Sequence, residues 1–460
     1  MSLDKIHEAI GADFEAHLEA IRRFIRTPSI SADGTGIAET AEEVRGFIEE
    51  VGGEGEIVPT EGHPIVYGEL MLGKPKTLLI YGMYDVMPVE GEEWMVPPFD
   101  AEIVDLPPFG RCLVNRGVHN SKGPLRAFFN AVAAIRQVDE LPVNLKFLIE
   151  GEEEQSSRNL PAFVRSNKAR LQSDAVFFPF FAMDNRGQPV VHLGAKGMIH
   201  LELECQGGEW GGPRTRGIHS SHGAWIASPP WKLVHALASL VDEDESIAVE
   251  GLYDDVNEPS TEDEELLARL APMFDETKIL DEADALRFKF EGLHGEELLK
   301  KYMFSPVINI DGLVAGHIGE GIKTVIGHKA TAKMDIRLVP NMTVEGTVRK
   351  VQDHLAGHGF EDVQVRVRGG YRWARTSVHE PVVQALLETY RHHGYEAEIW
   401  PYIGGSAPFY LFHDELGIPI VPGGLGHGGN PHSPNEYAVV EGIELFEKSI
   451  ATFLHKYASL

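Results

Sequence analysis

The sequence predicts an α/β fold in which a domain with a mostly parallel sheet is interrupted by an inserted α+β domain. Apolar, β-branched runs alternate with helical patterns through the first half of the chain. Such alternation is typical of an open, mostly parallel sheet with helices between its strands. Near residue 195 the pattern changes to strands in which apolar and polar side chains alternate, which indicates a sheet with one solvent-exposed face.

Three apolar runs in the first half predict buried strands, at 77–82, 143–149 and 174–178. A helix is predicted over 124–138, because its apolar residues recur at helical spacing. Pro124 suits the first turn of that helix, where a missing backbone N–H costs nothing.

Alternating runs at 198–207, 330–340 and 363–370 mark the inserted domain, and a long helical stretch lies between the first two. The Asp- and Glu-rich part of that stretch, 241–300, is most simply a solvated helical face. Strand and helix signals of the first kind resume after about residue 372. We therefore expect a first domain formed by 1–194 and 373–460 and an inserted domain formed by 195–372.

Composition narrows the class of partner. The 460 residues carry a formal net charge of −29, which repels phosphate backbones and anionic lipid, so we expect no nucleic-acid or membrane partner. Cys112 and Cys205 are too few for a disulfide framework. The first residues form an amphipathic helix start without an apolar signal core, and no apolar run reaches the roughly 20 residues of a membrane span. We expect a cytoplasmic protein.

Ligands of open α/β sheets bind beyond the carboxyl ends of the strands. Glu152, Glu153 and Glu154 follow one predicted strand directly, and crowded carboxylates raise one another's pKa unless a cation or donor relieves them. The alternative is a solvent-exposed turn that tolerates acidic side chains. The distant segment 430–437, NPHSPNEY, carries a histidine in a motif-like setting.

Eight motifs together make a family recognisable. In chain order they are GMYDVMPVEGEEWMVPPFDAEI, RGVHNSKGPLRAF, EGEEEQSS, HLGAKG, GIHSS, DIRLVPNMT, GGSAPF and PHSPNEY. In this order they resemble the zinc aminoacylase, carnosinase and succinyl-diaminopimelate desuccinylase family, in its dipeptidase branch. The resemblance implies a catalytic domain of the zinc-peptidase type, a lid and dimerisation domain in the insertion, and a homodimer formed through that lid.

The family's first metal position is altered in this sequence. The resemblance places its first histidine ligand at Met83, its bridging aspartate at Asn120 and its later aspartate at Phe180. A thioether is a weak ligand for zinc, an amide oxygen brings no charge, and phenylalanine brings nothing. We therefore expect this first metal site to be absent.

The second metal position keeps more of its residues. The resemblance assigns Glu154 and His432 as metal ligands and Glu153 as the general base. His119 is a replacement ligand or, alternatively, an ordinary hydrogen-bonded histidine. Because a catalytic zinc normally takes three protein ligands and a water, two states stay open: one zinc or manganese ion, or none.

The resemblance also assigns residues that handle the substrate. His219 matches the lid histidine that polarises the scissile carbonyl across the dimer, and Arg337 matches the residue that grips a substrate carboxylate. Gly404, Gly405 and Ser406 form the substrate-carboxylate loop. The alternatives are a surface ion pair for Arg337 and an ordinary lid histidine for His219.

Three functions remain open at this point. The first is a hydrolase of a small carboxylate-bearing amide, such as a dipeptide or an N-acyl amino acid, with at most one metal and with Glu153 and Asp85 in the catalytic set. The second is a metal-independent enzyme that uses Glu153. The third is a non-catalytic protein that binds a small carboxylate through residues such as Arg337 and Ser406. Asn120 could contact a metal, the substrate or only the backbone.

Overall fold

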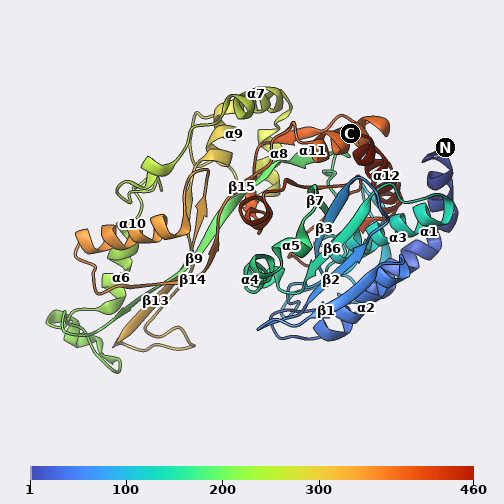
Figure 1. Ribbon diagram of the computed structural model, residues 1–460. Helices are drawn as coiled ribbons and strands as arrows, with labels where there is room; N and C mark the ends of the chain where they lie inside the picture. Colours follow the sequence, from blue (N-terminus) through green and yellow to red (C-terminus); the bar gives the residue numbers. More distant parts are fainter. Residues whose placement is uncertain (1–2) are drawn as a thin grey trace. The chain divides into compact units, whose positions relative to one another are not determined.

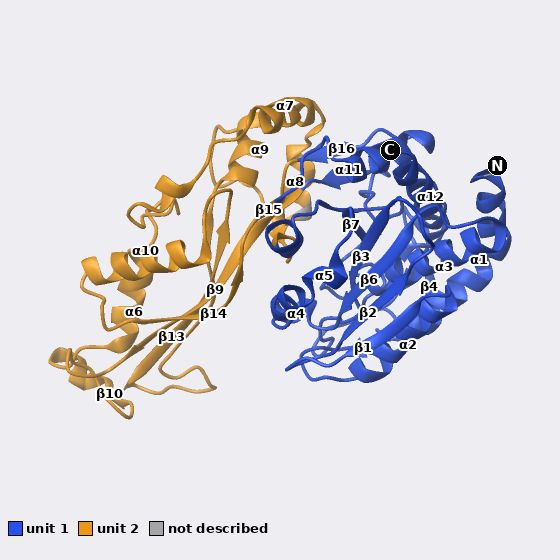
Figure 2. Cartoon of the chain, viewed as in Figure 1, with its two compact units in different colours: residues 1–193, 375–400, 411–460 blue, residues 194–374, 401–410 orange. Residues whose placement is uncertain are grey.

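The structure is a computed structural model that describes residues 3–460. The chain forms two compact units (Figure 2). Unit 1 comprises residues 1–193, 375–400 and 411–460, and unit 2 comprises residues 194–374 and 401–410. The segment 401–410, which we expected in the first domain, falls in unit 2 because its strand β17 (Ile403–Ser406) pairs with β9 (Gly194–Gln206).

Unit 1 is built on a six-stranded sheet with the order β1-β2-β6-β3-β7-β18. The strands are β1 (Glu54–Val58), β2 (Ile65–Leu70), β3 (Thr77–Met83), β6 (Asn144–Glu150), β7 (Ala175–Pro179) and β18 (Ile420–Gly423). Strands β6, β3, β7 and β18 run parallel, and β2 pairs antiparallel both with β6 and with the edge strand β1. The sheet is therefore mostly parallel, and β3, β6 and β7 are the strands that the apolar runs predict.

Four helices pack together on one face of this sheet (Figure 1). They are α1 (Leu3–Arg26), α2 (Ile37–Glu50), α3 (Lys122–Val138) and α12 (Val440–Ser459). Helix α3, predicted over 124–138, begins two residues earlier, and most of its side chains are buried. The other helices are α4 (Leu160–Ser166), α5 (Lys168–Leu171) and α11 (Pro381–His392).

Two smaller sheets complete unit 1. One has the order β19-β20-β5-β4, and the other pairs β16 with β8. Their strands are β4 (Glu102–Leu106), β5 (Gly110–Val114), β19 (Gly428–Gly429), β20 (Tyr437–Val439), β8 (Val190–His192) and β16 (Glu398–Trp400). Strand β20 brings the C-terminal motif of the sequence to β5, directly before the loop that carries His119 and Asn120.

Unit 2 is an antiparallel sheet with the order β11-β13-β9-β14, to which β15 and β17 add through β9. The strands are β11 (Val307–Ala315), β13 (Lys329–Leu338), β14 (Gln364–Tyr371) and β15 (Ala374–Arg375). Helices α6 (Pro229–Ala238) and α10 (Val344–Gly357) cover one face and bury the apolar side chains of β9 and β13. This one-sided burial explains the alternating pattern of the sequence.

The remaining elements of unit 2 are the short pair β10 (Ile218–His219) and β12 (Val325–Ile326) and the helices α7 (Thr261–Leu270), α8 (Glu276–Glu282) and α9 (Gly295–Phe304). The acidic segment 241–300 thus contains amphipathic helices: α7 and α9 bury leucines and expose Glu264, Glu265, Glu296 and Glu297, whereas Asp263 is buried in the capping box of α7. No described helix is long and apolar enough to cross a membrane.

Candidate active site

The turn after β6 is held by a buried carboxylate. Asp85, just beyond the end of β3, is fully buried, and its oxygens accept the backbone N–H groups of Glu153 at 3.1 Å and Glu154 at 3.0 Å. Burial, and secondly the charge of Glu154, raises the pKa of Asp85 to about 7. These contacts support a positioning role for Asp85, which fixes the backbone of the turn.

Glu153 begins the short 3-10 helix η1 (Glu153–Gln155) at the carboxyl end of the parallel sheet, and it is half-buried. Burial first, and then the negative charges of Glu154, Glu150 and Asp85, raise the pKa of Glu153 well above its ordinary value. A carboxyl group with a raised pKa is suited to exchange a proton near neutral pH.

Asn120, Glu154 and His432 come together from three distant parts of the chain. The Asn120 Nδ2 group donates to Glu154 Oε1 at 3.0 Å and lies 2.9 Å from His432 Nε2. His432 Nε2 is 3.0 Å from the same Glu154 oxygen. The Glu154 side chain is 5% exposed and that of His432 is 51% exposed. The bond to Glu154 raises the pKa of His432 above its ordinary value. We call these three residues the Asn120 cluster.

Apolar and aromatic side chains occupy two of the positions that the resemblance assigns to the first metal. Met83, at the end of β3, is 2% exposed. Phe180 follows the neighbouring strand β7, and its ring lies 4.8 Å from that of His119 between centroids. His119 is buried, its Nδ1 atom has no hydrogen-bond partner, and burial lowers its pKa to about 3. The contacts of the His119 ring are thus aromatic packing.

A second buried carboxylate, which the sequence reasoning missed, fixes the loop of Asn120. Glu436 Oε1 accepts the backbone N–H groups of His119 and Asn120, both at 2.9 Å. Its Oε2 accepts the Gly117 N–H at 3.0 Å and pairs with Arg116 at 3.1 Å. The motif PHSPNEY contains Glu436, so the signal was present, but its role required knowing which loop lies beside it.

In unit 2, Arg337 on β13 makes two contacts that fix its guanidinium. Its Nε donates to Asp335 Oδ1 at 2.8 Å, and its Nη1 donates to Ser406 Oγ at 2.9 Å. The ion pair that we weighed as the alternative for Arg337 is therefore present. The contact with Ser406 at the same time joins two residues that the resemblance assigns to one carboxylate.

In the loop before Ser406, the backbone lies close to the Tyr302 side chain. The Gly404 N–H donates to the Tyr302 hydroxyl at 3.2 Å, and a Cβ atom at Gly404 would lie 2.3 Å from that oxygen. The next residue, Gly405, is exposed.

Lys196 is a further residue that the sequence reasoning missed. It is buried beside Arg337 and donates to the carbonyl oxygens of Tyr302 and Ser305, at 2.6 and 2.8 Å. Burial, and secondly the charge of Arg337, lowers the pKa of Lys196 to about 8.

His219 lies on the exposed segment that joins β10 to a short 3-10 turn. Its Nδ1 is 2.8 Å from Ser221 Oγ, and its Nε2 is 3.3 Å from Thr324 Oγ1. Two hydroxyl groups therefore orient the ring within unit 2.

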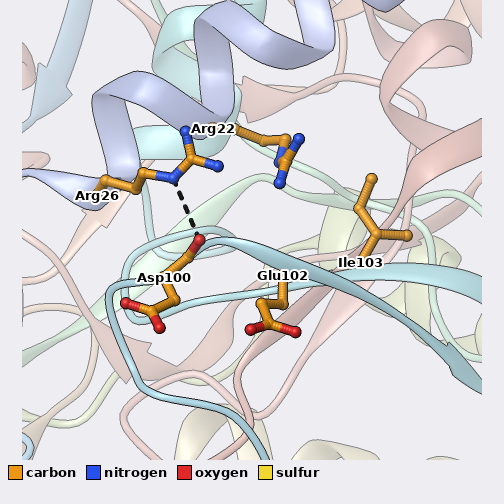
Figure 3. A pocket seen from close by; sticks show the side chains of 5 residues that line it. All are labelled: Arg22, Arg26, Asp100, Glu102 and Ile103. Atoms are coloured by element: carbon orange, nitrogen blue, oxygen red, sulfur yellow. Dashed lines mark hydrogen bonds between the residues drawn. The ribbon is translucent and has the colours of Figure 1, made fainter.

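One further depression in unit 1 contains none of the candidate residues (Figure 3). It is lined by Arg22, Arg26, Asp100, Glu102 and Ile103. Its lining carries two cations and two carboxylates, and Arg26 Nε donates to the Asp100 carbonyl oxygen at 3.1 Å. Its charges are balanced within the protein, so we assign it no ligand.

The mostly parallel sheet with an acidic turn at its carboxyl edge and the inserted antiparallel unit give the chain a two-unit α/β architecture. Residues 79–456 match Peptidase family M20/M25/M40, and the chain belongs to this family.

Among its relatives, the chain is 33% identical to human Beta-Ala-His dipeptidase over 300 residues, which span 64% of this chain and 56% of that protein. It is 26% identical to the Cys-Gly metallodipeptidase of Schizosaccharomyces pombe, over 100% of this chain and 99% of that protein. Among solved structures, an M20 family metallo-carboxypeptidase from Sulfolobus solfataricus superposes with a TM-score of 0.89 and 33% identity, covering 96% of this chain and 99% of that one.

Two of these proteins, the Schizosaccharomyces pombe dipeptidase and the Sulfolobus solfataricus carboxypeptidase, are named as metal-dependent enzymes. Within residues 3–460, no group of three or more His, Cys, Asp or Glu side chains is arranged to hold a metal ion. Met83 and Phe180 offer no ligand of the kind that zinc prefers. Glu154 and His432 are joined by the neutral amide of Asn120, which presents its N–H to them.

Proposed function

We propose that this protein hydrolyses a small amide that carries a carboxylate, such as a dipeptide or an N-acyl amino acid. The observation that carries the proposal is Glu153, a half-buried carboxyl group at the carboxyl end of the parallel sheet, whose backbone is fixed by Asp85. Membership of a peptidase family and the dipeptidase names of two relatives support the same reaction class.

Glu153 acts as the general base in this proposal. Its carboxylate accepts a proton from water, the water oxygen attacks the amide carbonyl carbon, and a tetrahedral intermediate forms. The C–N bond then breaks, and the protonated Glu153 returns the proton to the leaving amine. The raised pKa of Glu153 suits both proton transfers, because the group must be deprotonated before attack and protonated after it.

The intermediate carries a negative oxygen that requires donors. His432 is half-exposed, and its bond to Glu154 favours the protonated ring, so it can supply one N–H donor. We assign the second donor to His219, whose ring is oriented by Ser221 and Thr324. One well-placed donor of this kind contributes about 10²–10³ in rate.

Arg337, Ser406 and the backbone of Gly405 bind the substrate carboxylate in this proposal. A guanidinium matches the two oxygens of a carboxylate, and the Ser406 hydroxyl already lies 2.9 Å from Arg337 Nη1. The buried ammonium of Lys196 adds positive charge beside Arg337. Substrates without a carboxylate should therefore react poorly.

We further propose a homodimer formed through unit 2. Strand β11 is the outer strand of its sheet, and it exposes Ile310, Leu313 and Val314. An apolar edge strand exposed to water invites pairing with another chain. Light scattering should then give twice the chain mass of 50.8 kDa, and a charged residue at Leu313 should lower that value toward one chain.

The experiment is a screen of dipeptides and N-acyl amino acids, with the released amine quantified by mass spectrometry. The natural protein should hydrolyse a subset of them, and Glu153→Gln should lower kcat by about 10²–10⁴ because the general base is lost. Glu152→Gln is the matched control, since the Glu152 carboxylate accepts from Asn159 Nδ2, a bond that a glutamine oxygen can keep.

Equal activity in Glu153→Gln and the natural protein would refute the assignment of the base. Binding of a carboxylate ligand without any turnover across the screen would refute hydrolysis. It would instead favour a non-catalytic binding protein that uses Arg337 and Ser406.

A further inference from the structure

The Asn120 cluster occupies the position where the sequence resemblance places the second metal. Three polar atoms meet there: Asn120 Nδ2, Glu154 Oε1 and His432 Nε2. Their separations are 3.0, 2.9 and 3.0 Å, so each atom lies within hydrogen-bond distance of the other two. The lone pairs that would face a cation are therefore directed at protein hydrogens instead.

The proton inventory of the cluster supports this description. The Asn120 amide is a donor at Nδ2 and brings no negative charge. When the His432 ring carries a proton on Nε2, that proton and the Asn120 N–H both converge on Glu154 Oε1. When the ring is neutral with a bare Nε2, Asn120 can donate to it as well. In each case the Glu154 oxygen already has a donor from the protein.

The charge inventory points the same way. Of the three side chains that would meet a divalent cation here, only Glu154 is a carboxylate. Asn120 is a neutral amide at the position where the resemblance places the bridging aspartate. The substitution of the bridging aspartate by Asn120 thus removes the charge that a dication needs.

The surroundings hold the asparagine in place. Glu436 Oε1 accepts the backbone N–H of Asn120 at 2.9 Å, and Glu154 receives its backbone restraint from Asp85 at 3.0 Å. Both anchoring carboxylates are buried. Two buried carboxylates of the chain therefore position the cluster from both sides.

We propose that the Asn120 side-chain amide replaces the second cation of this family, so that Asn120 is a positioning residue for Glu154 and His432 in a metal-independent site. This inference deepens the proposed function and rests on it where hydrolysis is concerned. The metal state can be measured without any substrate, so the two can fail separately.

The first experiment measures metal content by plasma mass spectrometry on protein purified without chelator and without a histidine tag. The natural protein should hold less than about a tenth of an equivalent of zinc or manganese, also after soaking in either metal. About one equivalent that is lost in Glu154→Gln or His432→Ala would overturn the inference, whatever the protein hydrolyses.

The second experiment restores the missing charge. Asn120→Asp places a carboxylate beside Glu154 and His432, which completes a set of three ligands of the kinds that zinc prefers. Calorimetric titration with Zn²⁺ should show binding at least roughly 100-fold tighter than to the natural protein, and Zn²⁺ should raise the midpoint of thermal unfolding. Asn257→Asp, on an exposed loop of unit 2, is the matched control and should bind as weakly as the natural protein.

A folded Asn120→Asp variant that gains no affinity for Zn²⁺ would contradict the inference. If this variant does not fold, the metal content of the natural protein and of Glu154→Gln still tests whether the site binds a metal. Hydrolysis by the natural protein that survives a chelator supports the inference. A metal-free protein that hydrolyses nothing leaves it standing and refutes only the proposed function.

Discussion

The two units differ in how far their candidate residues depart from the pattern that the sequence resemblance implies. In unit 1 the positions assigned to metal ligands hold Met83, Asn120 and Phe180, and the retained Glu154 and His432 bond to Asn120. In unit 2 the residues assigned to a substrate carboxylate are all present, and Arg337 contacts Ser406 directly.

This difference separates two tasks that a metallopeptidase site combines. Binding a carboxylate needs only a fixed guanidinium and a few donors, and unit 2 supplies these from β13 and β17, which both pair with β9. Holding a cation needs several ligands around one point, and the described residues of unit 1 form no group of three or more His, Cys, Asp or Glu side chains arranged in this way. We infer that the first task is retained and the second abandoned, and the predictions below test each side.

The largest effect should come from Met83, if packing has taken over at the first metal position. Met83→Ala removes a 2% exposed side chain, and we expect it to lower the free energy of unfolding by about 2–5 kcal/mol. Denaturant titration followed by circular dichroism measures the change.

Met95, which is 53% exposed, offers the matched control. Met95→Ala should alter the free energy of unfolding by less than about 0.5 kcal/mol. Equal, small effects of the two substitutions would show that Met83 does not stabilise unit 1 by packing. The comparison between the units could then no longer include packing at the first metal position.

Arg337→Lys tests unit 2 and should have the next largest effect. Lysine keeps the positive charge but loses the planar pair of donors, so kcat/KM for a carboxylate-bearing substrate should fall by roughly 10–100-fold, mainly through KM. Steady-state kinetics on the best substrate of the screen gives the ratio. For a protein that binds without turnover, the same change should appear in Kd.

Arg368→Lys serves as the control, because Arg368 lies on β14 and pairs on the surface with Glu202. An exposed pair of this kind contributes little, and kinetics should be unchanged. If both lysine variants lose affinity equally, the loss reflects the sheet as a whole and not a carboxylate contact of Arg337.

A smaller, pH-dependent effect on stability should come from Glu150, a buried carboxyl group of unit 1. Burial raises the pKa of Glu150 to about 8, and its Oε1 accepts from Tyr81 at 2.6 Å and from Ser157 at 3.0 Å. Between pH 4.5 and 8 the folded protein therefore holds a proton that the unfolded chain releases. Its stability falls as pH rises through that range.

Glu150→Gln removes this titration. We expect the variant to gain about 1–3 kcal/mol relative to the natural protein at pH 8 compared with pH 5, as measured by denaturant midpoints at the two pH values. A difference between the proteins that does not change with pH would mean that Glu150 is ionised in the folded state.

Much of the fold could be predicted from local patterns. The apolar runs at 77–82, 143–149 and 174–178 correspond to β3, β6 and β7, and the alternating run at 198–207 lies within β9 except for its last residue. Such patterns are reliable because burial on one or both faces of a sheet determines the period of apolar residues within a single element.

We predicted the segment 401–410 within the first domain, whereas it groups with unit 2, because β17 pairs with β9, about 200 positions earlier in the chain. No local pattern carries that information. The same limit explains why Glu436 was missed, because its three backbone donors lie more than 300 residues earlier in the chain.

The sequence by itself determined which residues stand at each motif position, including Met83, Asn120 and Phe180 where the resemblance places metal ligands. Only the tertiary structure decided what these residues contact: the Asn120 amide meets Glu154 and His432, and Asp85 supports the backbone of Glu153. The physical reason is one of scale. Side-chain periodicity is set within a few residues, whereas a hydrogen bond forms only when the whole fold brings distant donors and acceptors to within about 3 Å.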